Sequence, residues 1–170
     1  MKKKLLAAVL LITAAAWLLP LAAGADLPKV FPEFSTRGLT GEKVSNALFA
    51  EKKVTMLNIW ATWCPPCIGE MPELASLARS MPEGSRMAGL ILDVTNRETA
   101  DRAKSILRQS QADFLQILPV EALQPLLLEI SAIPTTIFVD STGKIVGRVL
   151  VGARSEKAYR VELEQLLASM

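Results

Sequence analysis

The chain of 170 residues contains no histidine and only two cysteines, Cys64 and Cys67. Without histidine, it has no Ser-His or Cys-His nucleophile pair and no imidazole to hold a zinc ion. A covalently attached c-type haem is excluded as well, because its attachment requires Cys-x-x-Cys-His. We therefore expect neither a cofactor nor a metal ion, and the two thiols are the groups left to carry chemistry.

A strong excess of one charge sign is also missing. Lys plus Arg number 19 and Asp plus Glu number 17, which gives a formal charge of +2. Lys2, Lys3 and Lys4 supply three of the positive charges, so the remainder of the chain is close to neutral. Because a surface that binds phosphates needs clustered basic residues, we expect no nucleic-acid partner.

Residues 1–25 have the layout of a secretory signal peptide. The basic residues Lys2–Lys4 precede the largely apolar stretch Leu5–Leu19, which Pro20 ends, and Ala23-Gly24-Ala25 forms a small-x-small cleavage pattern. An uncleaved membrane anchor is the alternative, since ~20 apolar residues are enough to span a bilayer. In both cases we expect residues 26–170 to lie outside the cytoplasm, in the periplasm or on the outer face of the cytoplasmic membrane.

Beyond residue 25, strand and helix patterns alternate, which is typical of an α/β domain. Near-continuous apolar runs predict strands covered on both faces, and apolar residues at helical spacing predict amphipathic helices. Strands are expected at 54–61, 87–94, 114–118, 135–139 and 145–151, with a small edge hairpin formed by 31–36 and 43–45. Helices are expected from residue 65, at 99–109, over 123–130 and near the C-terminus. The predicted fold is one α/β domain with a mixed sheet.

The segment Cys64-Pro65-Pro66-Cys67 follows a predicted buried strand and opens a predicted helix. The free N–H groups and the dipole at a helix N-terminus favour a thiolate, so the pKa of Cys64 is expected to be lowered. Cys67, one helical turn later, is expected to be buried and close enough to form a disulfide with Cys64. Pro65 is compatible with the first helical position, whereas Pro66 removes a further N–H that would have stabilised the thiolate.

Three other interpretations of the cysteine pair are weaker. Half of a metal site would need further soft ligands, and the chain has no other cysteine and no histidine. A purely structural disulfide would close too short a loop to constrain much of the chain. A chance pairing would not be expected between a buried strand and a helix. The pattern therefore favours a redox-active dithiol.

Three segments together resemble the thioredoxin-like proteins of the TlpA/ResA type. They are Leu57-Asn-Ile-Trp-Ala-Thr-Trp-Cys-Pro-Pro-Cys67, Glu70-Met-Pro72 and Ile133-Pro-Thr-Thr136, and the resemblance extends over about residues 34–167. It implies a thioredoxin fold, with a mixed central sheet flanked by helices, an N-terminal β-hairpin and an insert before the cis-proline strand. Members of this family are extracytoplasmic thiol–disulfide oxidoreductases, and many of them keep thiols reduced during cytochrome c assembly.

The resemblance also implies roles for individual residues. Cys64 matches the attacking cysteine and Cys67 the resolving one, and Pro134 matches a cis-proline that lies against the cysteine pair. The backbone of Ile133 would then offer a short strand edge to a client peptide. Trp63, Pro65 and Pro66 would form the rest of the client-binding surface, with Trp63 covering the thiols. The alternatives are an ordinary trans proline at position 134 and a Trp63 side chain that only packs in the hydrophobic core.

Glu70 matches a glutamate that the family places near the thiols, where a carboxylate raises thiol pKa values and relays protons. The alternative is an exposed helix residue.

Asn58 lies six residues before Cys64, where cytoplasmic thioredoxins have a buried aspartate. Because asparagine is no general base, proton handling falls to Glu70, and Asn58 is otherwise a buried hydrogen-bonding residue. Ala132 departs from the family, which usually has glycine there, and this leaves the loop geometry open.

The sequence therefore predicts an extracytoplasmic enzyme that reduces disulfides in client proteins such as apocytochrome c. A membrane electron-donor protein would restore its dithiol, and nothing in the sequence suggests that it is more than a monomer. An oxidant that installs disulfides in secreted proteins would use the same residues in the opposite direction. A client-binding module without turnover is a second alternative, although a binder has no need of two cysteines.

Overall fold

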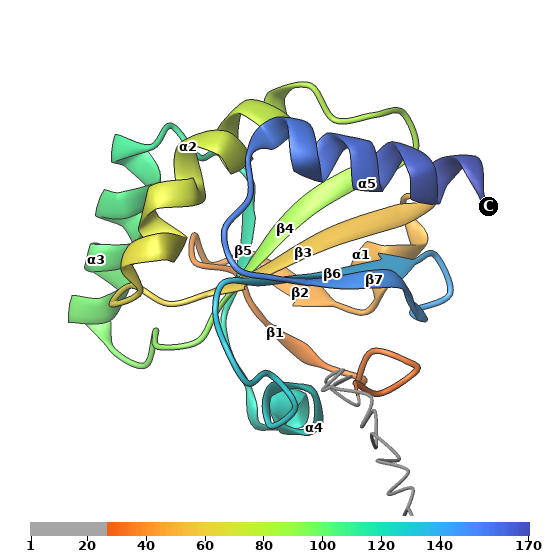
Figure 1. The fold of residues 1–170 in the computed structure, drawn as a ribbon. Helices are drawn as coiled ribbons and strands as arrows, with labels where there is room; N and C mark the ends of the chain where they lie inside the picture. Colours follow the sequence, from red (N-terminus) through yellow and green to blue (C-terminus); the bar gives the residue numbers. More distant parts are fainter. Residues whose placement is uncertain (1–26) are drawn as a thin grey trace, which may run out of the picture.

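The computed structural model describes residues 27–170, so the predicted signal peptide lies outside the described residues (Figure 1). Within residues 27–170 no helix is both long enough and apolar enough to cross a bilayer. The described part is built around a five-stranded sheet with the strand order β5-β4-β3-β6-β7. The strands are β3 (Val54–Trp60), β4 (Ser85–Ile91), β5 (Leu115–Ile117), β6 (Thr135–Asp140) and β7 (Ile145–Val151).

The sheet is mixed, with β3 at its centre. Strands β3, β4 and β5 run parallel, whereas β6 is antiparallel to β3 and β7 is antiparallel to β6. Every residue of β3 is buried, as expected for a strand covered on both faces. The tight turn between β6 and β7 contains Gly143 at φ 84°, a backbone conformation that glycine adopts without steric cost. The arrangement places the carboxyl end of β3, which leads to the cysteines, in the middle of the sheet edge.

One face of the sheet carries the three long helices. These are α2 (Pro65–Arg79), α3 (Arg97–Gln109) and α5 (Glu156–Ala168). Their apolar residues, among them Leu74, Leu107 and Leu163, pack with Val54, Met56 and Trp60 of β3 into one hydrophobic core. Since alternate residues of a strand point to opposite faces, Asn58 lies on this same face. The polar side chain of Asn58 therefore lies within the layer of α2 and α5.

The opposite face is covered by shorter elements. They are α1 (Ala47–Ala50), the 3₁₀ turn η1 (Glu121–Leu123) and α4 (Gln124–Leu127), next to the two-stranded sheet of β1 (Ser35–Arg37) and β2 (Lys43–Ser45). Leu57 and Ile59 of β3 pack there against Phe31, Phe49 and Leu126. In Figure 1, α4 lies on the side of the sheet opposite to α2 and α5. The two cores share β3, so that the central strand is enclosed by both layers.

Two boundaries differ clearly from the sequence prediction. The first arm of the hairpin starts at Ser35 rather than at Phe31. Phe31 and Phe34 instead pack edge to face in the core on the α1 and α4 side of the sheet. The predicted helix over 123–130 is only one 3₁₀ turn followed by one α-helical turn that ends at Leu127. Pro125 is suited to the first turn of a helix, so it lies at the point where the α-helical part begins. The predicted fold class is otherwise confirmed.

Candidate redox site

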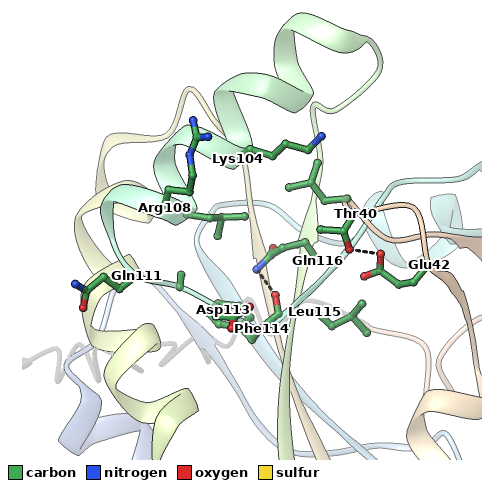
Figure 2. A pocket seen from close by; sticks show the side chains of 12 residues that line it. Thr40, Glu42, Lys104, Arg108, Gln111, Asp113, Phe114, Leu115 and Gln116 are labelled. Atoms are coloured by element: carbon green, nitrogen blue, oxygen red, sulfur yellow. Dashed lines mark hydrogen bonds between the residues drawn. The ribbon is translucent and has the colours of Figure 1, made fainter.

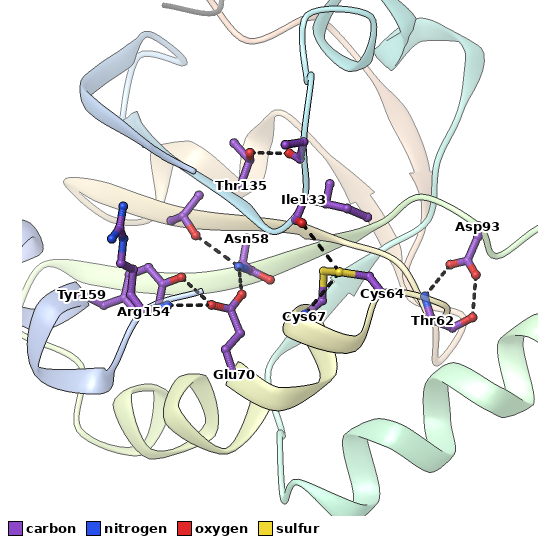
Figure 3. Close-up of a disulfide and its surroundings, with 12 residues drawn as sticks. Asn58, Thr62, Cys64, Cys67, Glu70, Asp93, Ile133, Thr135, Arg154 and Tyr159 are labelled. Carbon is purple, nitrogen blue, oxygen red and sulfur yellow. Dashed lines mark hydrogen bonds between the residues drawn. A yellow bond between two sulfur atoms is a disulfide. The ribbon is translucent and has the colours of Figure 1, made fainter. Parts of the chain in front are cut away.

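Cys64 and Cys67 form a disulfide at the start of α2, directly beyond the end of β3 (Figure 3). The S–S distance is 2.01 Å and the two Cα atoms are 5.3 Å apart. Cys64 is the N-cap of α2, and its sulfur accepts a hydrogen bond of 3.2 Å from the backbone N–H of Cys67. Pro65 opens the helix, as its fixed φ and missing N–H allow. The predicted position of the cysteine pair between a buried strand and a helix is confirmed.

The two cysteines differ in their access to solvent. Cys67 is fully buried, as predicted, and Cys64 retains 3% exposure. The neighbouring Trp63 is 63% exposed, so it does not belong to the core, whereas Trp60 is completely buried. Pro65 and Pro66 are also exposed. The disulfide thus lies just beneath a surface of exposed apolar residues, with Cys64 as its more accessible end.

The loop before β6 closes over the disulfide from the other side. The Ile133–Pro134 peptide bond is cis, in agreement with the expectation for Pro134. The carbonyl oxygen of Ile133 lies 3.8 Å from Cys64 Sγ, as Figure 3 shows. Ala132 is exposed, its carbonyl accepts a 2.7 Å hydrogen bond from the hydroxyl of Thr135, and it is not among the residues with positive φ. Alanine therefore fits this loop without a backbone conformation reserved for glycine.

Glu70 is buried one turn beyond Cys67, which rules out the exposed-helix interpretation. It is 3% exposed, and its carboxylate accepts three hydrogen bonds. The donors are Asn58 Nδ2 at 2.9 Å, the Tyr159 hydroxyl at 2.8 Å and the backbone N–H of Arg154 at 3.1 Å. Burial raises the pKa of Glu70 above its ordinary value, and the three donors oppose that rise. A carboxyl group in such a place is suited to exchanging protons nearer to neutral pH.

Asn58 connects Glu70 with the central sheet. Its side chain is fully buried, and Nδ2 also donates to the hydroxyl of Thr136 at 3.1 Å. Its Oδ1 has no hydrogen-bond donor among the described residues. In Figure 3 the Asn58 amide points toward the Glu70 carboxylate. Asn58 is therefore a buried hydrogen-bonding residue, as the sequence predicted.

Three residues at this site were missed by the sequence analysis. Asp93, just after β4, accepts hydrogen bonds from the backbone N–H of Thr62 at 3.0 Å and from its hydroxyl at 2.5 Å. Asp93 thereby fixes the turn that leads to Cys64, and its position at the carboxyl end of a predicted strand was an available signal. The contacts of Tyr159 and Arg154 with Glu70 connect residues more than 80 positions apart. No local pattern predicts such pairs.

A separate cavity of about 610 Å³ lies between α3 and the loop joining β1 to β2 (Figure 2). Leu39, Leu107 and Phe114 are among its apolar lining residues, and Lys104 and Arg108 lie on the α3 side. Gln116 also lines it and accepts a hydrogen bond from Trp60 Nε1 at 3.0 Å. Neither cysteine lines this cavity. Within residues 27–170 no group of three or more acidic or cysteine side chains is arranged to hold a metal ion.

Comparison with known proteins supports the same chemistry. The family model described as Redoxin matches residues 27–166. The thioredoxin-like protein YneN of Bacillus subtilis (strain 168) is 29% identical over 136 residues, which cover 80% of this chain and 75% of that protein. The thiol-disulfide oxidoreductase ResA of Bacillus cereus (strain ZK / E33L) is 28% identical over 141 residues, which cover 83% of this chain and 79% of that protein.

A solved structure supports the fold independently. The crystal structure of a thiol:disulfide interchange protein of the thioredoxin family from Chlorobium tepidum TLS has a TM-score of 0.69 at 24% identity. It covers 82% of this chain and 97% of that chain. At this level of identity the likeness establishes the thioredoxin fold. Together with the family match and the disulfide at the N-terminus of α2, these similarities mean that the chain belongs to the Redoxin family and is a TlpA/ResA-like thiol–disulfide oxidoreductase.

Proposed function

We propose that this enzyme reduces disulfides in client proteins outside the cytoplasm, with Cys64 as the attacking and Cys67 as the resolving cysteine. The observation that carries the proposal is the disulfide at the N-cap of α2, in which Cys64 is the more exposed partner and Cys67 is fully buried. This difference in access supports the assignment, because only a thiolate that reaches the surface is able to attack a disulfide in another protein.

The reaction begins with the reduced enzyme. The Cys64 thiolate attacks one sulfur of the client disulfide, a Cys64–client mixed disulfide forms, and the other client sulfur leaves as a thiolate. The Cys67 thiol then loses its proton, for which Glu70 is the nearby acceptor, and its thiolate attacks Cys64 Sγ. The second client thiolate leaves, and the Cys64–Cys67 disulfide forms. Two electrons pass from the enzyme to the client, and the described structure corresponds to the oxidised product.

The client would bind over the exposed surface around Cys64. Trp63, Pro65 and Pro66 offer apolar contact area there, and the backbone of Ile133, next to the cis-proline Pro134, offers a short edge for a peptide in extended conformation. Disulfide-containing apocytochrome c is the client class that the family resemblance favours. A membrane electron-donor protein would then reduce the Cys64–Cys67 disulfide again, because an extracytoplasmic compartment is oxidising. Residues 1–25 supply the export signal, and the domain would act as a monomer.

Substitution of each cysteine tests the proposed roles. Cys67→Ser is expected to accumulate mixed disulfides with clients, since the resolving step is lost, whereas Cys64→Ser is expected to form none. Non-reducing gels and mass spectrometry of the trapped adducts would show the difference. Full disulfide-reductase activity in Cys64→Ser would refute the proposal. Clients bound by Cys67→Ser without a covalent bond would indicate a binding module in place of an enzyme.

The direction of electron flow depends on the reduction potential. The reduction potentials of known dithiols range from about −270 mV for thioredoxin to about −120 mV for a strong oxidant. Equilibration of the purified protein with glutathione buffers, followed by quantification of the two redox forms, measures this value. We expect a potential at the reducing end of the range. A value at the oxidising end would show that the enzyme installs disulfides instead of reducing them.

A further inference from the structure

The C-terminal helix α5 contributes a buried polar group to the redox site. Tyr159, in the first turn of α5, is fully buried, and its hydroxyl donates a 2.8 Å hydrogen bond to Glu70 Oε2. Figure 3 shows the phenol reaching Glu70 from the side opposite to the disulfide. Packing alone would be satisfied by phenylalanine at this position. The hydroxyl group of Tyr159 therefore needs an explanation other than packing in the core.

The bonds around Glu70 are divided between its two oxygens. Oε1 accepts from Asn58, whereas Oε2 accepts from Tyr159 and from the backbone N–H of Arg154. Burial and the charge of Glu70 both raise the pKa of Tyr159, so the phenol stays protonated at neutral pH and remains a donor. A permanent donor on Oε2 favours the ionised carboxylate and fixes its orientation.

The other groups near Glu70 supply its electrostatic environment. A shallow hollow of about 410 Å³ is lined by Glu70 together with Pro66, Gly69, Glu73 and residues 153–155. Of the charged side chains there, Arg154 stabilises the Glu70 carboxylate, while Glu73 accepts a 2.7 Å hydrogen bond from the backbone N–H of Glu156. From the sheet, Asn58 of β3 and Thr136 of β6 are neutral, and Cys67 lies one turn earlier on α2. Tyr159 is therefore the side-chain donor that α5 supplies to this carboxylate.

We propose that Tyr159 is a positioning residue of the redox site, which holds the Glu70 carboxyl group in place and sets the pH range over which that group exchanges a proton. This inference rests on the proposed function of Glu70 as the proton acceptor for Cys67. It also makes α5 part of the redox machinery, because the first turn of α5 and the loop before it supply two of the three donors to Glu70.

Tyr159→Phe removes the hydroxyl and keeps the ring, so it tests the proposal directly. We expect the midpoint of Glu70 ionisation to move upward by ~1 pH unit, because the ionised form loses a charge-assisted hydrogen bond. Carboxyl ¹³C NMR of the oxidised, labelled protein follows this titration, with Glu70→Gln to assign the signal. The matched control is Thr55→Val, which removes a buried hydroxyl that has no hydrogen-bond partner among the described residues. It is expected to leave the midpoint unchanged.

A second readout connects the titration with the reaction. The pH profile of disulfide reduction is expected to shift upward in Tyr159→Phe, whereas the same change in a Glu70→Gln background is expected to leave the profile unaltered. An unchanged Glu70 midpoint in Tyr159→Phe, with or without a loss of stability, would overturn the inference and leave Tyr159 a packing residue. A wild-type protein that fails to reduce disulfides would instead refute the proposed function, since the NMR titration does not depend on activity.

Discussion

Burial of Glu70 is expected to make the stability of the protein depend on pH. In the folded protein Glu70 is 3% exposed, and its pKa is raised chiefly by loss of solvation. The folded state therefore binds this proton more tightly than the unfolded state, in which the pKa of Glu70 is near its ordinary 4.5. The stability that comes from the neutral carboxyl group is present at low pH. It decreases as the pH rises above 4.5 through the raised folded-state value.

We accordingly expect Glu70→Gln to change the pH dependence of stability. The free energy of unfolding of the wild type, relative to that of the variant, should fall between acidic and neutral pH, because only the wild type must ionise a buried group. Urea unfolding of both oxidised proteins at several pH values measures this difference. Glu164→Gln, at an exposed position of α5, is the matched control. Parallel curves for wild type and Glu70→Gln would contradict the expectation.

Asp93 holds the turn that precedes the disulfide. Asp93→Ala removes the acceptor of two hydrogen bonds from Thr62, a residue that is almost fully buried. Because a buried donor left without a partner is costly, we expect the free energy of unfolding to fall by ~1–3 kcal/mol. Urea denaturation measures the loss, with Asp101→Ala as the control, since Asp101 forms an exposed ion pair with Arg97 at 3.8 Å. A loss no larger than that of the control would show that the turn is held by other contacts.

At the scale of elements, the packing of α5 determines whether Tyr159 reaches Glu70. Leu163, one turn after Tyr159, is fully buried in the core that α5 shares with α2. Leu163→Ala is therefore expected to lower the free energy of unfolding by ~2–5 kcal/mol, through lost apolar burial and the cavity left behind. Val161→Ala, at a position that is 44% exposed, should have a much smaller effect in the same denaturation experiment. Equal effects of the two substitutions would mean that α5 contributes little to the core.

Helix α5 also shows how far the spacing of apolar residues predicts a helix. The spacing of Tyr159, Leu163, Leu166 and Leu167 predicts an amphipathic helix, which the structure confirms. The helix over 123–130 was predicted by an equally regular pattern and is much shorter, because apolar spacing indicates which face is buried and not how many turns are formed.

At the scale of the whole molecule, one sheet joins the two hydrophobic cores. Each residue of β3 is buried between them, so that neither core is able to form without the central strand. We therefore expect the described domain to unfold in a single cooperative transition in the oxidised state. Far-UV and near-UV circular dichroism during urea unfolding should give the same midpoint. Two separate midpoints would show that the layer of α1 and α4 unfolds independently of the layer of α2 and α5.

The sequence by itself determined the central strand, the helix that follows it and the cysteine pair between them. These are local features, since a buried strand, an N-terminal proline and a Cys-x-x-Cys spacing all lie within residues 54–67. The family resemblance supplied the expectations for Pro134 and Glu70, which no spacing rule would have placed near the cysteines. Tertiary structure alone decided that the Glu70 carboxyl group is held by Tyr159 and by the backbone of Arg154. Hydrogen bonds between residues so far apart depend on how helices pack on a sheet, and neither periodicity nor local propensity contains that information.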